Sequence, residues 1–291
     1  MITLVKPENT RIAFIGGGNM ASAIIGGLLK NNITADQILA VDPMATARDR
    51  LEKSYGVRLA GSISEAENFL GAADLIVLAV KPTHLMDALD QLQQVLKQRQ
   101  NIQQDPVLVL SIVAGVLTQD ICKKLGHDRV IRSMPNTPAL INQGITGLFA
   151  GKGVKKQDQQ LVEWVCGAIG KSVWVPSEKQ LDAVTAISGS GPAYVFFMIE
   201  NLLQAGIELG LSPENALQLA NQTIIGAGML AQQSQDAPGV LREKVTSKGG
   251  TTFAALEVLR QANWGSTLKQ AVNAANERSS EMGQEFTNSM K

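Results

Sequence analysis

The sequence has no net charge and little cysteine or histidine, and each shortage excludes a class of function. Lys plus Arg and Asp plus Glu each total 26 among 291 residues, so no net field draws the chain to nucleic acid or to an anionic membrane. The two cysteines and two histidines show no metal-ligand spacing. We therefore expect no nucleic-acid partner, no membrane partner and no metal site.

The few cysteines and histidines fit structural roles. Cys122 and Cys166 lie far apart in apolar periodic stretches, where a free thiol behaves as a small hydrophobic side chain. We expect both to be buried, and His84 and His127 to lie at the surface.

No targeting segment is visible either. Residues 1–7 lack the basic start and apolar run of a secretory signal, and the longest apolar stretch, 107–117, is interrupted by Ser111 and Gly115. These features predict a cytoplasmic protein. With 45% hydrophobic and 18% charged residues over this length, two globular domains are expected.

Short apolar runs alternate with amphipathic segments in the first half of the chain. This rhythm is typical of a doubly wound parallel sheet of the Rossmann type. The predicted parallel strands are 11–15, 38–41, 75–80, 107–113 and 130–134. The helices predicted between them are 20–29, 46–55, 83–97 and 117–125. Further strands are predicted at 147–150 and 172–175, with a helix over 156–168 between them.

The second half reads as helical throughout. Pro176 marks a boundary, and no strand pattern follows Glu178. Helices are predicted over 193–209, 213–233, 250–260 and 264–282, with a Ser212–Pro213 start for the second. The fold class is therefore α/β, with a dinucleotide-binding domain over 1–176 and an all-α domain over 177–291.

The segment 192–198 is apolar on all sides. Such a helix needs cover on every face, which a domain of this size does not supply alone. We therefore predict a homodimer formed through the C-terminal helices.

A glycine-rich loop follows the first predicted strand. Its sequence Gly-Gly-Gly-Asn-Met-Ala fits the G-x-G-x-x-A/G motif that opens a helix and binds a pyrophosphate at the helix N-terminus. The residues predicted to bind the dinucleotide are Gly16, Gly17, Gly18, Asn19 and Met20, with Ala21 allowing close packing of helix on strand.

The sequence leaves the adenosine end of the cofactor open. Asp42 ends the second strand, where a carboxylate commonly holds the ribose hydroxyls of NADH. Arg48 and Arg50 follow and could neutralise the 2′-phosphate of NADPH, or be simply solvated. The cofactor is therefore NADPH or NADH.

Another strand runs into a short polar segment at the carboxyl edge of the sheet. Open α/β folds bind ligands at this edge. Backbone groups of Ala79, Val80, Lys81 and Pro82 could line the cofactor, and Lys81 could be a catalytic cation or an exposed strand end.

Three later clusters, at 132–138, 185–192 and 246–252, combine turn residues with hydroxyl groups. The last two are predicted at helix starts, where free N–H groups suit a small carboxylate. Helix capping is the alternative for any single hydroxyl. No nucleophile with a nearby base stands out, which fits chemistry carried by a cofactor.

Five motifs together resemble a known family in order and over nearly the whole chain. FIGGGNMASAIIGGL, AVKP, RSMPNTPAL, ISGSGPAYVFF and VTSKGGTT are similar to pyrroline-5-carboxylate reductase. The resemblance implies hydride transfer from NAD(P)H to the C=N carbon of 1-pyrroline-5-carboxylate, giving L-proline in the last step of its biosynthesis. It also implies an active site between the cofactor domain of one subunit and the helices of an intertwined dimer, and it leaves open a decameric ring.

The resemblance also implies roles for particular residues. Thr185 would hydrogen-bond the ring nitrogen as the catalytic hydroxyl, and Ala114 and Gly115 would lie near the cofactor. The residues implied to face the nicotinamide and substrate are Met134, Pro135 and Asn136, and those implied to bind the carboxylate are Ser247, Gly249, Gly250, Thr251 and Thr252. Lys248 departs from the proline common at its place, which questions the rigidity of this loop.

Two other functions are also compatible with the sequence. A β-hydroxyacid type of dehydrogenase would need a catalytic lysine on a C-terminal helix, for which Lys244 and Lys248 are the candidates. A cofactor-binding sensor would keep the glycine loop but would need no hydroxyl-lined acid pocket.

Overall fold

The computed structural model describes residues 9–101 and 105–289, which form two compact units. The first unit runs to Gly189 and takes in the chain again from Asn276, and the second comprises Ser190–Ala275. The predicted boundary at 176/177 thus falls within the first unit, and the end of the chain returns to that unit. Residues 1–7, on which the prediction of no secretory signal rests, lie outside the described residues.

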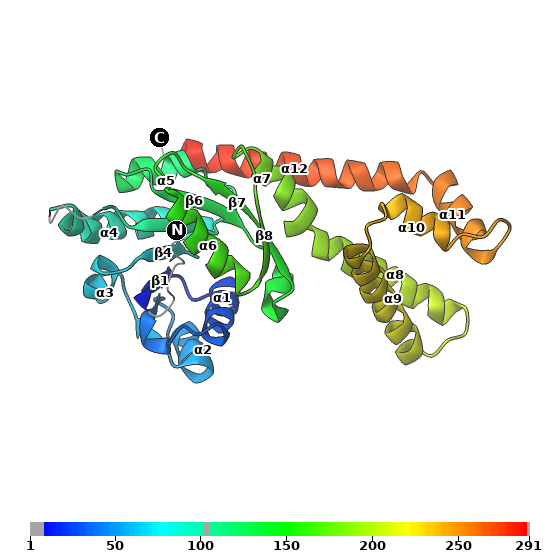
Figure 1. The fold of residues 1–291 in the computed structure, drawn as a ribbon, viewed down its shortest axis with the longest axis horizontal. Helices are drawn as coiled ribbons and strands as arrows, with labels where there is room; N and C mark the ends of the chain where they lie inside the picture. The colour runs from blue at the N-terminus through cyan, green and yellow to red at the C-terminus, as the bar shows by residue number, and fades with distance from the viewer. Residues whose placement is uncertain (1–8, 102–104, 290–291) are drawn as a thin grey trace. The chain divides into compact units, whose positions relative to one another are not determined.

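An eight-stranded sheet forms the centre of the first unit (Figure 1). Its order is β3-β2-β1-β4-β5-β6-β7-β8, and all neighbours pair in parallel except β6 with β7. The strands are β1 (Ile12–Ile15), β2 (Ile38–Val41), β3 (Arg58–Ala60), β4 (Leu75–Leu78), β5 (Leu108–Ser111), β6 (Val130–Met134), β7 (Gly144–Ala150) and β8 (Gly170–Trp174). The seven predicted strands are confirmed, with β7 starting three residues before its predicted start at 147.

Helices cover both faces of this sheet, as a doubly wound fold requires. Alternate strand residues enter two separate cores: Ile12 and Phe14 pack on one face, and Ala13 and Ile15 on the other. The first face is covered by α1 (Asn19–Lys30), α2 (Ala45–Tyr55) and α6 (Lys156–Gly167). The second face is covered by α3 (Glu67–Gly71), α4 (Pro82–Asn101) and α5 (Thr118–Leu125).

Several short elements were missed by the sequence reading. β3 has only three residues at the edge of the sheet, and α3 has five, so neither is long enough to show a period. The segment between Pro176 and residue 193, for which no helix was specified, contains α7 (Gln180–Val184) and a π-helical turn, η4 (Thr185–Gly189). Short 3₁₀ turns, η2 (Ala35–Gln37) and η3 (Thr137–Ile141), complete this unit.

The second unit is helical throughout, as predicted. It contains α8 (Gly191–Glu208), α9 (Pro213–Gln233), α10 (Pro238–Lys244), α11 (Thr251–Gln261) and the start of α12 (Trp264–Ser289). Ser212 caps α9 as predicted, since its hydroxyl accepts a hydrogen bond from Asn215 N at 3.2 Å. α10 was missed because its seven residues span only two turns.

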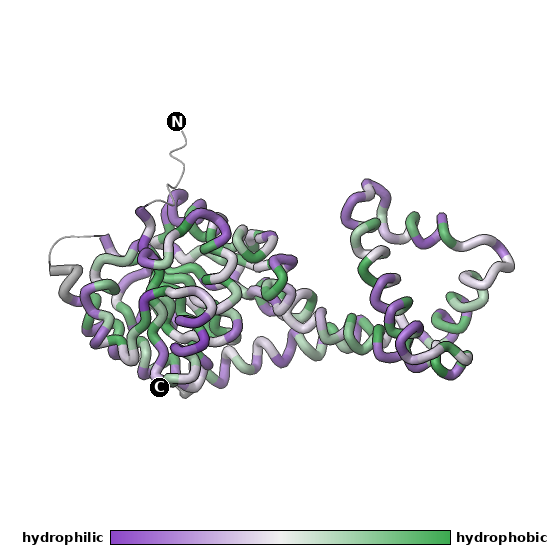
Figure 2. The backbone as a smooth tube through the Cα atoms, turned by 90° about the horizontal axis from the view of Figure 1, so that it is seen from below, coloured by the Kyte–Doolittle hydropathy of each residue, from purple (hydrophilic) through white to green (hydrophobic). Residues whose placement is uncertain are grey.

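Small residues set the packing of α8 on α9. A Cβ on Gly206 would lie 2.9 Å from Cβ of Ala216, so the two helices approach closely where both side chains are small. The same helices leave large apolar side chains exposed, including Phe196 (64%) and Phe197 (67%) on α8. Figure 2 shows hydrophobic stretches along the helices of this unit as well as in the strands of the first. Within the described residues, α8 buries no side chain fully.

The expectations for cysteine and histidine are confirmed only in part. Cys166 is buried, but Cys122 is half-buried. His84 is exposed and His127 is half-buried, although the two ring nitrogens of His127 are buried and lack a hydrogen-bond partner among the described residues. Burial lowers the pKa of His127. Among the described residues, no helix is long and apolar enough to cross a membrane.

Candidate functional site

The glycine loop joins β1 to α1 at the carboxyl edge of the sheet. Gly16 has a φ of +104°, and a Cβ there would lie 2.6 Å from the carbonyl oxygen of Ala79. Glycine is therefore required at this position by both backbone and space. The turn is closed by Gly16 N, which donates to Val41 O at 2.8 Å.

Gly18 differs from Gly16, because nothing in the protein requires it to be glycine. Its φ is −67°, and a Cβ there would meet no atom within 4 Å. Gly18 is the N-cap residue of α1 and provides no side-chain cap. The first turn of α1 consequently offers free backbone N–H groups beside open space, an arrangement that suits a pyrophosphate.

The Asp42 carboxylate braces this loop from the end of β2. One carboxylate oxygen accepts a hydrogen bond from Gly17 N at 2.7 Å, and the other accepts from Met44 N at 2.9 Å. Arg48 donates to the backbone carbonyls of Asp42 (2.7 Å) and Pro43 (3.0 Å). A cation therefore lies at the loop after β2.

Arg50 lies on the other side of the same loop. Its guanidinium donates to Gly17 O at 2.7 Å and to the Asn19 side chain at 3.3 Å. The two arginines, which the sequence left as solvated or phosphate-binding, are thus both fixed against the backbone around the glycine loop.

The ends of β4 and β5 lie beside the glycine loop through parallel pairing. Ala79 N donates to Ile15 O at 2.8 Å, and Lys81 is exposed at the start of the following helix. Beyond β5, Gly115 has a φ of +76° and is buried. A Cβ on Gly115 would lie 3.2 Å from Cβ of Met282. The last turns of α12 therefore cover this loop, a contact that the sequence did not predict.

The Met134–Asn136 segment follows β6 at the same edge. Pro135 and Asn136 are buried, and the Asn136 side-chain oxygen accepts a hydrogen bond from Ile145 N at 2.9 Å. Its amide N–H₂ group remains the part that could donate to a ligand. The Met134 methyl group packs against the π-helical turn, since a Cβ on Gly189 would lie 2.8 Å from it.

Thr185 begins that π-helical turn. Its hydroxyl donates to Leu181 O at 2.8 Å, and the Ser188 hydroxyl donates to Val184 O at 2.9 Å. Hydroxyl bonds of this kind to the carbonyl four residues earlier often bend a helix. The predicted helix start lies at the end of this cluster, where α8 begins at Gly191 with Ser190 as its N-cap and no side-chain cap, whereas Thr185 itself lies inside η4. Single π-helical turns are frequent at functional sites.

The cluster at 246–252 lies in the second unit and does begin a helix. Gly250 is the N-cap of α11 and gives no side-chain cap, so the first N–H groups of this helix are free. Gly249 has a φ of +74°, and a Cβ on Gly250 would lie 2.5 Å from the Ser247 hydroxyl oxygen. The positive φ therefore favours glycine at position 249, whereas a side chain at position 250 would require the Ser247 hydroxyl to move. Thr251 and Thr252 open the helix and are exposed.

The thiols and acidic groups do not form a second kind of site. Burial raises the pKa of Cys166 to about 12, and burial with the charges of Asp128 and Glu178 raises that of Cys122 to about 11. Both thiols are protonated at neutral pH and are poor nucleophiles. No cluster of metal-ligand residues occurs in the described part of the chain.

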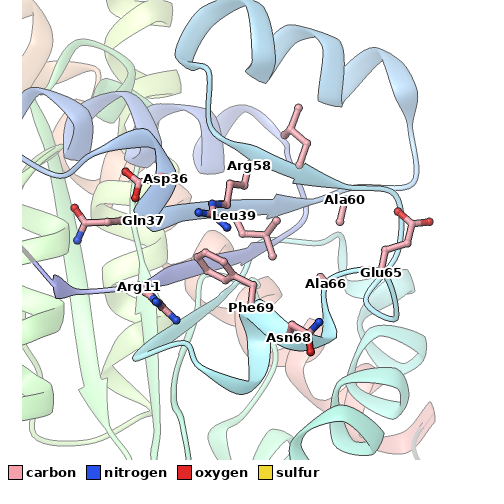
Figure 3. A pocket seen from close by; sticks show the side chains of 11 residues that line it. Arg11, Asp36, Gln37, Leu39, Arg58, Ala60, Glu65, Ala66, Asn68 and Phe69 are labelled. Atoms are coloured by element: carbon pink, nitrogen blue, oxygen red, sulfur yellow. The ribbon is translucent and has the colours of Figure 1, made fainter.

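A hollow of about 640 Å³ lies elsewhere, between α3 and the β2–β3 edge of the sheet (Figure 3). Arg11 and Arg58 line it, but so do the acidic residues Asp36 and Glu65. The Arg58 guanidinium carbon also lies 5.8 Å from the centre of the Phe69 ring. A hydrogen bond from Thr34 and the charges of both arginines lower the pKa of Asp36. The charges in this hollow thus compensate one another, and the glycine loop takes no part in its lining.

One buried ion pair in the first unit was not found from the sequence. Arg132 on β6 is 4% exposed and lies 3.3 Å from the carboxylate of Glu178. The two residues are 46 positions apart, and no short-range pattern joins them.

Two family models match the chain. Residues 11–115 match the model described as NADP oxidoreductase, coenzyme F420-dependent, and residues 178–282 match the model described as pyrroline-5-carboxylate reductase dimerisation. The first match covers the glycine loop through Gly115, and the second covers Thr185 and the 246–252 cluster.

Relatives match nearly end to end. Pyrroline-5-carboxylate reductase of Pseudomonas aeruginosa is 40% identical over 95% of this chain and 98% of its own length. The Arabidopsis thaliana enzyme of that name is 36% identical over 96% and 98%. A solved pyrroline-5-carboxylate reductase from Coxiella burnetii has a TM-score of 0.86 at 36% identity, covering 94% of this chain and 99% of its own.

A second solved structure comes from Plasmodium falciparum and has NADP bound. It is a pyrroline carboxylate reductase with a TM-score of 0.81 at 30% identity, covering 95% of this chain and 99% of its own. The similarity in sequence and in fold to these proteins extends over both compact units. The chain belongs to the pyrroline-5-carboxylate reductase family.

Proposed function

We propose that this chain catalyses the NAD(P)H-dependent reduction of 1-pyrroline-5-carboxylate to L-proline, the last step of proline biosynthesis. The observation that carries the proposal is the 40% identity to the Pseudomonas aeruginosa enzyme over 98% of that enzyme's length. The open space at Gly18, beside the free N-terminus of α1, supports the use of a dinucleotide.

The chain's own residues would hold the cofactor and orient the substrate. Gly16 and Gly18 would admit the pyrophosphate to the N-terminus of α1, and the Met134–Asn136 segment would face the nicotinamide. When bound, the nicotinamide supplies the hydride for the C=N carbon. A cyclic imine is readily protonated in solution, so hydride addition needs less help from a buried general acid than carbonyl reduction does. This agrees with the lack of any nucleophile–base pair in the predicted site.

Thr185 would position the protonated ring nitrogen. Its hydroxyl hydrogen is already directed to Leu181 O, which leaves the oxygen lone pairs as acceptors. A protonated imine N–H can donate to such an oxygen. Thr185 therefore orients the ring rather than protonating it.

The loop at 246–252 would bind the substrate carboxylate. Free N–H groups at the start of α11 and the Ser247 hydroxyl are donors that suit an anion. Lys248 lies in the same loop and adds positive charge.

The lysine required by the β-hydroxyacid reading finds no support. Lys244 is paired with Asp236 at 2.5 Å and its side chain is 62% exposed, and Lys248 is exposed. Neither lysine is buried, and burial is what tunes a lysine side chain for proton transfer. Cytoplasmic location and the lack of nucleic-acid and membrane partners stay predictions.

The cofactor choice is tested by measuring kcat/KM with NADPH and with NADH. Both Asp42 oxygens already accept backbone hydrogen bonds, and Arg48 provides a fixed cation, so we expect NADPH to be used at least as well as NADH. Arg48→Ala should lower kcat/KM for NADPH about tenfold relative to NADH, since it removes a charge-assisted contact. Lys53→Ala, an exposed change on the same helix, serves as the control. A strong NADH preference, unaltered in Arg48→Ala, would contradict this proposal.

The role of Thr185 is tested by Thr185→Ala with Thr185→Ser as the rescue. Loss of a hydrogen bond to a charged group costs about 1.5 to 3 kcal/mol, which corresponds to a loss of about ten- to a hundredfold in kcat/KM for the imine. The serine variant should retain most of the activity. Unchanged kinetics in Thr185→Ala would remove this hydroxyl from the mechanism.

Assembly is tested by light scattering at micromolar concentration. We propose a homodimer through the second unit, because that unit leaves Phe196 and Phe197 exposed in the single chain. The expected mass is at least twice the 31.0 kDa of one chain, and a tenfold mass would indicate a decamer. Replacing both phenylalanines by Asp should yield monomers, and Gln232→Asp on α9 should not. A monomeric native chain would refute the dimer.

A further inference from the structure

The Glu178 carboxylate joins three segments of the first unit that are far apart in sequence. One oxygen accepts hydrogen bonds from Thr118 N at 2.7 Å and from Arg132 Nη1 at 3.3 Å, and the other accepts from the Thr118 hydroxyl at 2.9 Å. Thr118 begins α5, Arg132 belongs to β6, and Glu178 precedes α7. One side chain therefore ties a helix start, a strand and a connecting segment.

These groups are largely removed from solvent. The side chains of Arg132 and Glu178 are 4% and 18% exposed, and Thr118 is buried. Removing one partner of such a pair leaves the other charge buried without compensation, which is strongly unfavourable. The three segments are thus held to one arrangement.

The contact with Thr118 fixes the loop that leads from β5. The residue before Thr118, Leu117, is the N-cap of α5 and gives no side-chain cap. Glu178 provides that cap from elsewhere in the chain, and its negative charge suits a helix N-terminus. Gly115 lies two residues before the capped turn, so the cap also limits the position of that loop.

The main chain of Glu178 leads to Thr185. Leu181 N donates to Glu178 O at 2.9 Å, and Leu181 O in turn accepts from the Thr185 hydroxyl at 2.8 Å. α7 has little room to move, because a Cβ on Gly147 of β7 would lie 2.6 Å from the Val184 side chain. A displacement at Glu178 is therefore passed to Thr185 rather than absorbed.

The contact with Arg132 fixes the third segment. Arg132 lies two residues before Met134 on β6, and the Met134 methyl group packs at Gly189, the end of the π-helical turn that Thr185 opens. The ion pair thus sets the distance between the strand that carries Met134 and the turn that carries Thr185.

We propose that Glu178 is a positioning residue for the reduction. Its carboxylate fixes the Gly115 loop, the Met134 segment and Thr185 relative to one another without touching the substrate. The inference rests on the proposed function, which assigns the Met134 segment to the nicotinamide and Thr185 to the imine, and on the family resemblance, which implies that Gly115 lies near the cofactor. The glycine loop that would bind the pyrophosphate is not connected to Glu178 by any of these contacts.

The test compares Glu178→Ala, Glu178→Gln and Thr118→Val in the full-length protein. Measured quantities are kcat and KM for 1-pyrroline-5-carboxylate, the Kd for ADP-ribose, which lacks the nicotinamide, and the Tm. Asp158→Asn is the matched control: Asp158 is also buried and pairs with Arg129 at 2.6 Å, but Arg129 precedes β6 at its other end. This control loses a buried ion pair without altering the proposed site.

Glu178→Ala should lower kcat on the order of tenfold, because small misplacements of reacting groups have large effects on rate. Its Kd for ADP-ribose should stay within about twofold of wild type. The kcat of Glu178→Gln, which keeps an acceptor for Thr118, should lie between those of Glu178→Ala and the wild type. Asp158→Asn should lower the Tm with kcat unchanged.

Either of two results would overturn the proposal: wild-type kcat in Glu178→Ala, or the same fractional loss of kcat in Asp158→Asn. If Glu178→Ala fails to fold, Thr118→Val and Glu178→Gln decide the matter, and wild-type kcat in both would refute the positioning role. A wild-type protein that does not oxidise NAD(P)H with the imine would instead refute the proposed function itself.

Discussion

Parallel pairing of β1 with β4 is the constraint on which the rest of the first unit depends. It brings the carboxyl ends of the two strands so close that a Cβ on Gly16 would lie 2.6 Å from Ala79 O. This approach aims the start of α1 over the sheet edge, where β5 and β6 also end. The Gly115 loop and the Met134 segment reach the same edge for that reason. Hydride chemistry with a dinucleotide needs such an edge, since the protein's contribution is position and electrostatics.

The second unit meets a different physical requirement. Its helices approach closely through small residues such as Gly206 and Ala216, yet they leave Phe196 and Phe197 exposed. Many other large apolar side chains of this unit are also exposed in the single chain, as is expected of a surface that contacts a partner. This agrees with the match of residues 178–282 to a family model described as pyrroline-5-carboxylate reductase dimerisation. The same unit carries the 246–252 loop. Gly249 in this loop has a left-handed backbone conformation, with φ of +74°, which favours glycine.

Periodic features could be predicted from the sequence, and features that depend on contacts between distant segments could not. The buried strands and long helices could be predicted from the spacing of apolar residues. The glycine loop could be predicted from its motif directly after a strand. The three-residue β3 is too short to show a period, and no local sequence pattern predicts the π-helical turn at Thr185. The burial of the two ring nitrogens of His127 was not predicted, because nothing in the neighbouring sequence indicates it. The Glu178–Arg132 pair spans 46 residues and is visible only once the sheet is formed.

We infer that the glycine loop between β1 and α1 binds a dinucleotide. A substitution of Gly18 tests binding without disturbing the fold. The backbone conformation of Gly18 is open to any residue, and an added Cβ would meet no protein atom within 4 Å. The most direct measurement is the Kd of NADPH for Gly18→Ala, by fluorescence titration, beside the Tm of the same variant. We expect a Kd at least about tenfold weaker, because the Cβ keeps the pyrophosphate from the backbone, with little change in Tm. An unchanged Kd would contradict the account.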